Sequence, residues 1–177
     1  MNRLHHTFLC FFGLACLAAS ATRPYFQQAL TYRIQVKLDD REHMLRGQVA
    51  IDYTNRSDSS LDELYLHVWP NAYREDRSGL ARELYGNQDP VFALTRPEER
   101  GFMDSLDFRC DGQDVQWTYF SGATDIIRIK LQQPLAPGTS MTLATPFRVK
   151  LPDAAISRLG HADGRYYLTQ WYPKLAV

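Results

Sequence analysis

The chain has 177 residues, with 20 lysines and arginines against 20 aspartates and glutamates, so its formal net charge is zero. Hydrophobic residues make up 45% of the sequence and aromatic residues 12%. This composition excludes a disordered tail, which has few aromatic residues, and it argues against nucleic acid as a partner because phosphate-binding proteins carry a basic excess. Three cysteines are too few for a disulfide scaffold.

The N-terminus has the features of an export signal. Arg3 precedes an apolar run over residues 8–19, and Ala19-Ser20-Ala21 forms an A-x-A pattern of small residues. The run is too short to cross a bilayer as a helix. We therefore expect a secretory signal peptide at residues 1–21, an exported domain at residues 22–177, and no transmembrane segment after cleavage. The alternatives are a buried N-terminal helix and a lipoprotein anchor at Cys16.

Apolar residues alternate with polar ones along most of the remaining chain. We expect strands at residues 32–38, 45–53, 64–68, 106–110, 115–119, 127–131 and 141–151, and a last one at residues 166–172. Asp111-Gly112 predicts a tight hairpin turn. Only residues 78–85 look helical, with Ser78 as N-cap, inside a long connection over residues 70–101. The pattern predicts an all-β fold: an antiparallel sandwich or saddle with one short helix in a long loop.

Sequence signatures of the common catalytic sites are absent. His43, His67 and His161 are isolated in sequence, and neither H-E-x-x-H nor C-x-x-C occurs, so we expect no metal site. The nucleophile elbow G-x-S-x-G and the glycine-rich nucleotide loops are missing as well. Cys110, the cysteine left after signal cleavage, has the spacing of a small core residue rather than a nucleophile. Asn55 opens an N-x-[ST] match that we interpret as a turn after the second strand.

Several short segments follow one another in a characteristic order along residues 25–177. They are YFQQ at 25–28 leading to YRI at 32–34, LHVWPNAY at 66–73, GFMDSL at 101–106, PLAPG at 134–138, FRVKLP at 147–152, SRLG at 157–160 and TQWYPK at 169–174. The ordered set resembles the N-terminal β-domain of the M1 family of zinc metallopeptidases (aminopeptidase N and its relatives), in particular its bacterial exported branch.

The resemblance implies a β-saddle that is followed by a thermolysin-like catalytic domain. That second domain would carry H-E-x-x-H and a downstream glutamate for zinc, none of which is present here. The implied picture is a fragment or truncated product that holds no cofactor itself, with zinc in the missing catalytic domain. Its implied partners are that domain in cis and, through the parent enzyme, a peptide substrate. We expect the chain alone to be inactive.

Two substrate-binding residues follow from the resemblance. The family's threonine-glutamine pair on the last strand of this domain matches Thr169-Gln170, and the residue two positions further is usually Glu or Gln. Those side chains help to bind the substrate's free amine, which implies this role for Gln170 and for Tyr172. On a strand, Gln170 and Tyr172 would share one face. Tyr172 brings no negative charge to an ammonium group, which departs from the family pattern and argues against strict aminopeptidase specificity.

The alternative function is an exported, non-catalytic β-sandwich that binds a glycan or a protein surface. Trp69, Trp117 and Trp171 would then supply stacking contacts. If a catalytic domain instead covers part of this chain, the face around residues 166–172 should be apolar and uncovered here.

Overall fold

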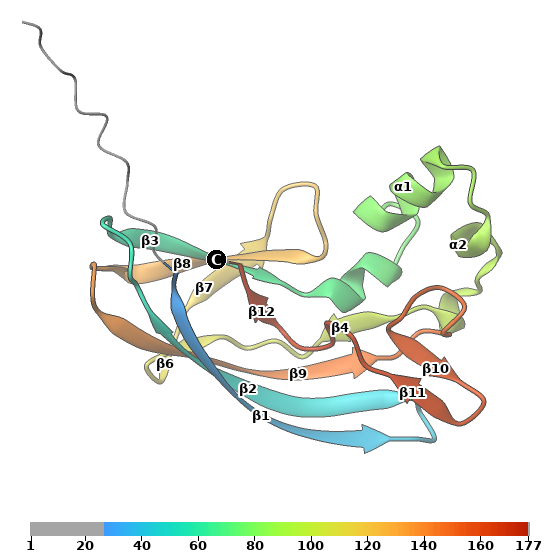
Figure 1. The fold of residues 1–177 in the computed structure, drawn as a ribbon, viewed down its shortest axis with the longest axis horizontal. Helices are drawn as coiled ribbons and strands as arrows, with labels where there is room; N and C mark the ends of the chain where they lie inside the picture. Colours follow the sequence, from blue (N-terminus) through green and yellow to red (C-terminus); the bar gives the residue numbers. More distant parts are fainter. Residues whose placement is uncertain (1–26, 177) are drawn as a thin grey trace, which may run out of the picture.

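A computed structural model describes residues 27–176, so the signal peptide expected at residues 1–21 lies outside the described part. Two antiparallel sheets pack against each other, and the helical segments gather at one end of them (Figure 1). The all-β prediction is confirmed. Within residues 27–176, none of the helices has the length and apolar character needed to cross a membrane.

The larger sheet, sheet A, has the strand order β1-β2-β9-β5-β6, and the short strand β4 also pairs with β9. Its long strands confirm the predicted N-terminal hairpin and the predicted strand over residues 141–151. At the β5–β6 hairpin, Asp111 and Gly112 have φ angles of 49° and 82°, as the predicted turn requires. The strands are β1 (Ala29–Asp39), β2 (Met44–Thr54), β4 (Phe102–Asp104), β5 (Arg109–Cys110), β6 (Gln113–Asp114) and β9 (Ser140–Lys150).

The smaller sheet, sheet B, has the order β12-β3-β8-β7 and covers one face of sheet A. Its strands are β3 (Leu61–His67), β7 (Gln116–Tyr119), β8 (Ile126–Leu135) and β12 (Lys174–Leu175). A separate hairpin of β10 (Gly160–Ala162) and β11 (Arg165–Tyr167) lies beside the end of the β1–β2 hairpin (Figure 1).

The long connection over residues 70–101 is folded against the sheets. It contains η1 (Trp69–Tyr73), the predicted helix α1 (Gly79–Gly86), α2 (Val91–Leu94) and η2 (Pro97–Glu99). The predicted N-cap is confirmed, because Ser78 Oγ accepts a hydrogen bond of 3.0 Å from the Ala81 N–H. The other helical segments were not predicted. A tertiary contact orders η1: the buried Asn71 accepts a 2.7 Å bond from the Met103 N–H.

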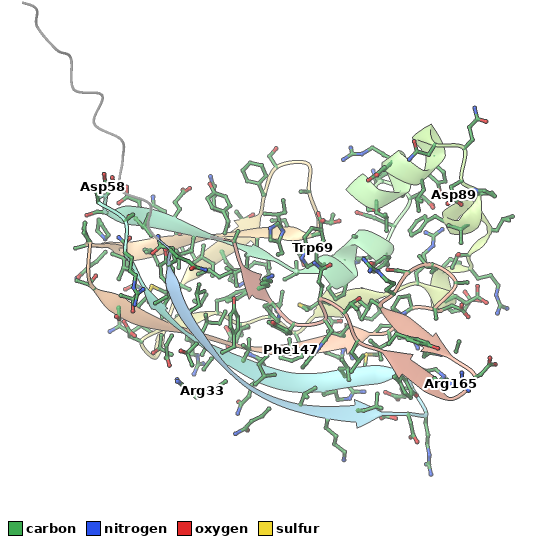
Figure 2. The ribbon with its side chains drawn as sticks, in the orientation of Figure 1. Arg33, Asp58, Trp69, Asp89, Phe147 and Arg165 are labelled. Carbon is green, nitrogen blue, oxygen red and sulfur yellow. The ribbon has the colours of Figure 1, made fainter. Side chains whose placement is uncertain are left out.

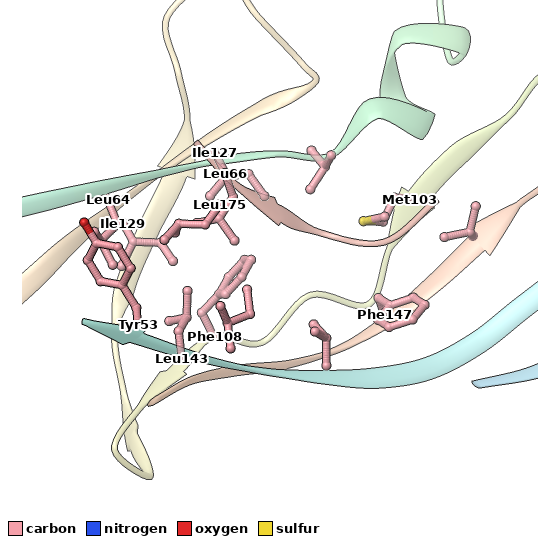
Figure 3. Close-up of a cluster of buried hydrophobic side chains, with 14 of the residues drawn as sticks. Tyr53, Leu64, Leu66, Met103, Phe108, Ile127, Ile129, Leu143, Phe147 and Leu175 are labelled. Atoms are coloured by element: carbon pink, nitrogen blue, oxygen red, sulfur yellow. The ribbon is translucent and has the colours of Figure 1, made fainter. Parts of the chain in front are cut away.

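The core lies between the two sheets and is built from the alternating apolar residues of their inner faces (Figure 3). Phe147 and Phe108 contribute the large rings from the sheet A side, and Cys110 packs at the margin of this cluster. The fully buried aliphatic residues include Leu45, Ile51, Leu66, Ile127, Ile129, Leu143 and Leu151.

Three details differ from the predicted strands. The inner face of β1 is covered only as far as Ile34, and Val36 and Leu38 are exposed. The strand predicted at residues 106–110 shrinks to β5, because Leu106 and Phe108 pack on the core from an irregular stretch. The strand predicted at residues 166–172 ends at Tyr167.

Asn55 forms the turn that the sequence predicts after the second strand. Its side chain is fully buried and donates to the carbonyl oxygens of Ser59 at 2.9 Å and Leu135 at 2.8 Å. The amide nitrogen that glycosylation would modify is therefore already engaged inside the fold.

Candidate functional site

The site implied by the sequence lies in the stretch that joins β11 to β12, which we call the closing segment (residues 168–173). The chain leaves the β10–β11 hairpin, runs between the sheets and enters sheet B as β12, where Leu175 lies opposite Leu66 of β3 (Figure 1). The closing segment thus spans from the hairpin at one end of the molecule to the edge of sheet B.

Aromatic side chains anchor the closing segment to sheet A. The Trp171 ring lies against Phe147, with 6.0 Å between ring centroids, and the Tyr172 ring meets Tyr32 edge-on at 5.4 Å. The Tyr32 hydroxyl accepts a 3.0 Å bond from the Leu175 N–H, and burial raises the pKa of Tyr32. Tyr172 therefore packs against β1.

Gln170 has a different position from the predicted one. Its φ angle of 51° lies in the left-handed region, which a strand cannot include, and the residue is exposed. The expectation that Gln170 and Tyr172 share one strand face is therefore wrong: the segment bends at Gln170, and Tyr172 is half-buried. The bend leaves the Gln170 amide available to solvent or a ligand.

A hollow of about 690 Å³ lies beside this bend. Tyr167 and Leu168 on its wall are 45% and 42% exposed. Trp171 and Tyr172 are half-buried, so the uncovered apolar surface expected over residues 166–172 is found only in part. No sequence pattern predicts this hollow, because residues 153–158 meet the closing segment only through the fold. The lining consists of Asp153, Ala154, Ala155, Ser157 and Arg158, Ala162 of β10, and Tyr167, Leu168 and Thr169.

The three tryptophans named for ligand stacking do not share a surface. Trp69 is stacked on His67 with 4.6 Å between ring centroids. Trp117 pairs opposite the buried Ile129 and lies among core aromatics, and Trp171 lies against Phe147. The geometry therefore provides no common stacking platform from these residues.

The described residues do not fit a zinc site. Within residues 27–176, no three histidine, cysteine, aspartate or glutamate side chains come together as metal ligands would. The half-buried Cys110 has its Sγ 3.8 Å from Met141 Sδ, and burial raises the pKa of its thiol. A raised pKa disfavours the thiolate that a nucleophile needs.

A second hollow, of about 570 Å³, lies on the outer face of sheet A. Arg33 points outward there, away from Phe147 (Figure 2). Its guanidinium makes two hydrogen bonds to the Asp52 carboxylate, and the Arg109 guanidinium lies 3.0 Å from the Asp114 carboxylate. The charges at this hollow are thus paired within the protein.

Fold and site together define an all-β, two-sheet domain whose closing segment carries an exposed polar bend beside an apolar hollow. No protein-family profile matches the chain, and no curated protein matches it.

Among solved structures, the chain is similar in part to an M1 zinc metallopeptidase from Deinococcus radiodurans, with 15% identity and a TM-score of 0.41 over 69% of this chain and 20% of that one. A mutant of the same enzyme bound to a Tyr-Ser-Ala substrate gives 15% identity and a TM-score of 0.41, over 69% of this chain and 21% of that chain. A two-domain M1 zinc metallopeptidase mutant bound to L-tryptophan gives 16% sequence identity and a TM-score of 0.41, over 71% of this chain and 21% of that chain. The chain thus spans about a fifth of the length of these proteins.

Proposed function

We propose that this chain is the non-catalytic N-terminal β-domain of an exported zinc metallopeptidase of the aminopeptidase type. The ordered segments along residues 25–177 support this proposal, and so does the confirmed two-sheet fold in which they are placed. The observation that carries it is the surface at the closing segment, where exposed Gln170 adjoins exposed Tyr167 and Leu168. A polar group at the margin of an uncovered apolar surface suits a cleft wall that a second domain completes.

In this proposal the chain positions a peptide and leaves the chemistry to the catalytic domain. The Gln170 side-chain oxygen would accept a hydrogen bond from the substrate's ammonium group. Tyr172 would act mainly by packing on Tyr32, which holds the bend in place. The zinc would be held by the catalytic domain in cis, where it would activate water and polarise the peptide carbonyl.

The first test concerns the chain alone. Purified chain incubated with zinc and aminoacyl-p-nitroanilides should release no p-nitroaniline, because the described residues do not assemble a metal site. Zinc-dependent release that survives further purification would contradict the proposal. Reading the coding sequence beyond codon 177 completes the test: an open frame with H-E-x-x-H supports the proposal, and a stop codon favours the non-catalytic binding module.

The second test concerns Gln170 in a protein that includes the catalytic domain. Gln170→Ala should raise KM for peptides with a free amino terminus by about tenfold to a hundredfold and leave kcat less affected, because a hydrogen bond to a charged group contributes about 1.5–3 kcal/mol. Steady-state kinetics on free and N-acetylated peptides measure this effect, which should be confined to the free amines.

Gln88→Ala is the matched control for Gln170→Ala. Gln88 is also exposed and has a φ angle of 58°, but it lies at the end of α1. Both substitutions place alanine in the left-handed region, so their effects on stability should be similar. Equal KM values for the two variants would show that Gln170 does not take part in substrate binding.

A further inference from the structure

Two histidines that are 118 positions apart in sequence stack on each other in the structure (161 − 43 = 118). The rings of His43 and His161 have 3.6 Å between their centroids and an interplanar angle of 12°. His43 lies in the turn between β1 and β2, and His161 lies in β10. The stack is therefore a contact between the β1–β2 turn and the β10–β11 hairpin.

A hydrogen-bond chain extends this contact. The Tyr166 hydroxyl on β11 donates to the Asp40 carbonyl oxygen at 3.1 Å and lies 2.9 Å from His43 Nδ1. Because the hydroxyl proton is directed to Asp40, His43 Nδ1 is the donor in the second bond. The hairpin is thus attached to the turn through one tyrosine and one stacked imidazole pair.

The charged groups around the stack come from every element that borders it. Lys150, at the end of β9, donates its ammonium to the Glu42 carbonyl oxygen at 2.7 Å. Asp153 forms a backbone bridge with His161. The carboxylates of Asp39 and Asp40 lie on the turn near Tyr166, and Glu42 of that turn pairs with Arg46.

Positive charge on the His161 ring is unfavourable in this setting. Burial, then the charges of His43 and Lys150, lower the pKa of His161 below its usual 6.5, and only Asp153 acts in the opposite direction. The docked hairpin therefore binds fewer protons than the undocked one. Docking is fully favoured above about pH 6.5 and weakens as the pH falls through that value.

We propose that the His43–His161 stack is a proton-sensitive latch, which holds the β10–β11 hairpin on the β1–β2 turn and releases it in mildly acidic solution. Release would also loosen the hollow beside the closing segment, because Ala162 and Tyr167 of the hairpin line it. The latch does not depend on the proposed peptidase role, since it concerns the docking of two parts of this chain.

Hydrogen exchange of the full chain, followed by mass spectrometry and corrected for the intrinsic pH dependence, tests the latch. Between pH 7.5 and pH 5.5, the exchange protection of residues 160–167 relative to β2 should fall by up to about tenfold, because pH 5.5 lies one unit below the usual pKa of histidine. His161→Phe keeps a stacking ring that cannot be protonated. In this variant, the ratio of exchange protection between residues 160–167 and β2 should stay constant with pH.

Two further variants keep the test decisive. His67→Phe removes a histidine from the other stacked pair, with Trp69, and should keep the wild-type pH response. His43→Phe removes a neighbouring charge but leaves His161 buried, so it should weaken the response without abolishing it, and it replaces His161→Phe if the latter does not fold. A constant protection ratio in the wild type, or a full response in either latch variant, would overturn the proposal.

Discussion

Replacement of Phe147 by alanine is expected to lower the free energy of unfolding by about 4 kcal/mol, near the upper end for large-to-small core substitutions. Phe147 is 2% exposed and lies opposite Gly47 of β2 in the sheet register. A Cβ at Gly47 would come within 3.0 Å of Phe147 Cζ, so the ring occupies the space above the glycine. The neighbouring strand offers no side chain at that position to fill the cavity.

The effect should extend to the closing segment. Trp171 lies against the Phe147 ring. Removal of the Phe147 ring should therefore increase the solvent exposure of the Trp171 indole. Urea unfolding measures the stability, and quenching of tryptophan fluorescence by iodide measures the exposure. Phe120→Ala is the control, because Phe120 is 43% exposed and should cost less than about 1 kcal/mol.

If Phe147→Ala fails to fold, the direction of the effect is as expected but its size cannot be measured. Phe147→Leu keeps most of the volume and should cost about 1–1.5 kcal/mol. A cost below about 1 kcal/mol for Phe147→Ala itself would show that the sheets collapse onto the vacated space.

Asn55→Ala is expected to cost about 3 kcal/mol. The Asn55 side chain donates to the carbonyls of Ser59 and Leu135, and its Oδ1 accepts from the Ser57 N–H at 3.0 Å and Ser57 Oγ at 2.6 Å. Alanine would remove the buried hydrogen bond to the Leu135 carbonyl, at about 1–3 kcal/mol for an unsatisfied group, and also the part-buried bonds to Ser57 and Ser59, which water can partly replace.

Thermal and urea unfolding of Asn55→Ala check this expectation, with Asn87→Ala as a matched control. Asn87 is exposed at the C-terminal end of α1, so its replacement should cost only a few tenths of a kcal/mol. Asn55→Asp keeps the acceptor but removes both donated hydrogen bonds and buries a charge, so it should be at least as destabilising as alanine. Equal stabilities of the Asn55 and Asn87 alanine variants would show that the hydrogen bonds of Asn55, including the one to Leu135 of β8, do not stabilise the fold.

The sequence predicted the features of the fold that depend on local pattern. Period-2 alternation located β2, β8 and β9 because alternate residues are buried over residues 49–53, 127–131 and 141–149. The Asp111-Gly112 turn and the Ser78 cap were found because each needs a specific residue at one position. These signals require no knowledge of distant parts of the chain.

The features that were missed depend on contacts between distant residues. The alternation of residues 166–172 continues past Tyr167, but the chain turns at Gln170 so that β12 can reach β3. In the same way, His43 and His161 carry no sequence signal for their stack. The identity of the candidate residue Gln170 came from a resemblance, whereas its exposure and the adjoining hollow came from the structure.

The central strand pair of sheet A has a consequence for the order of folding. β2 and β9 pair from Thr54 with Ser140 to Met44 with Lys150, so every contact in this ladder closes a loop of about 90 residues or more. The β1–β2 hairpin can form early, since its turn is short, but the other edge of β2 stays unpaired until β9 has been synthesised. Such non-local topology places folding in the slow regime of milliseconds to seconds, and a nascent chain that ends before β9 leaves the backbone groups along this edge of β2 unpaired.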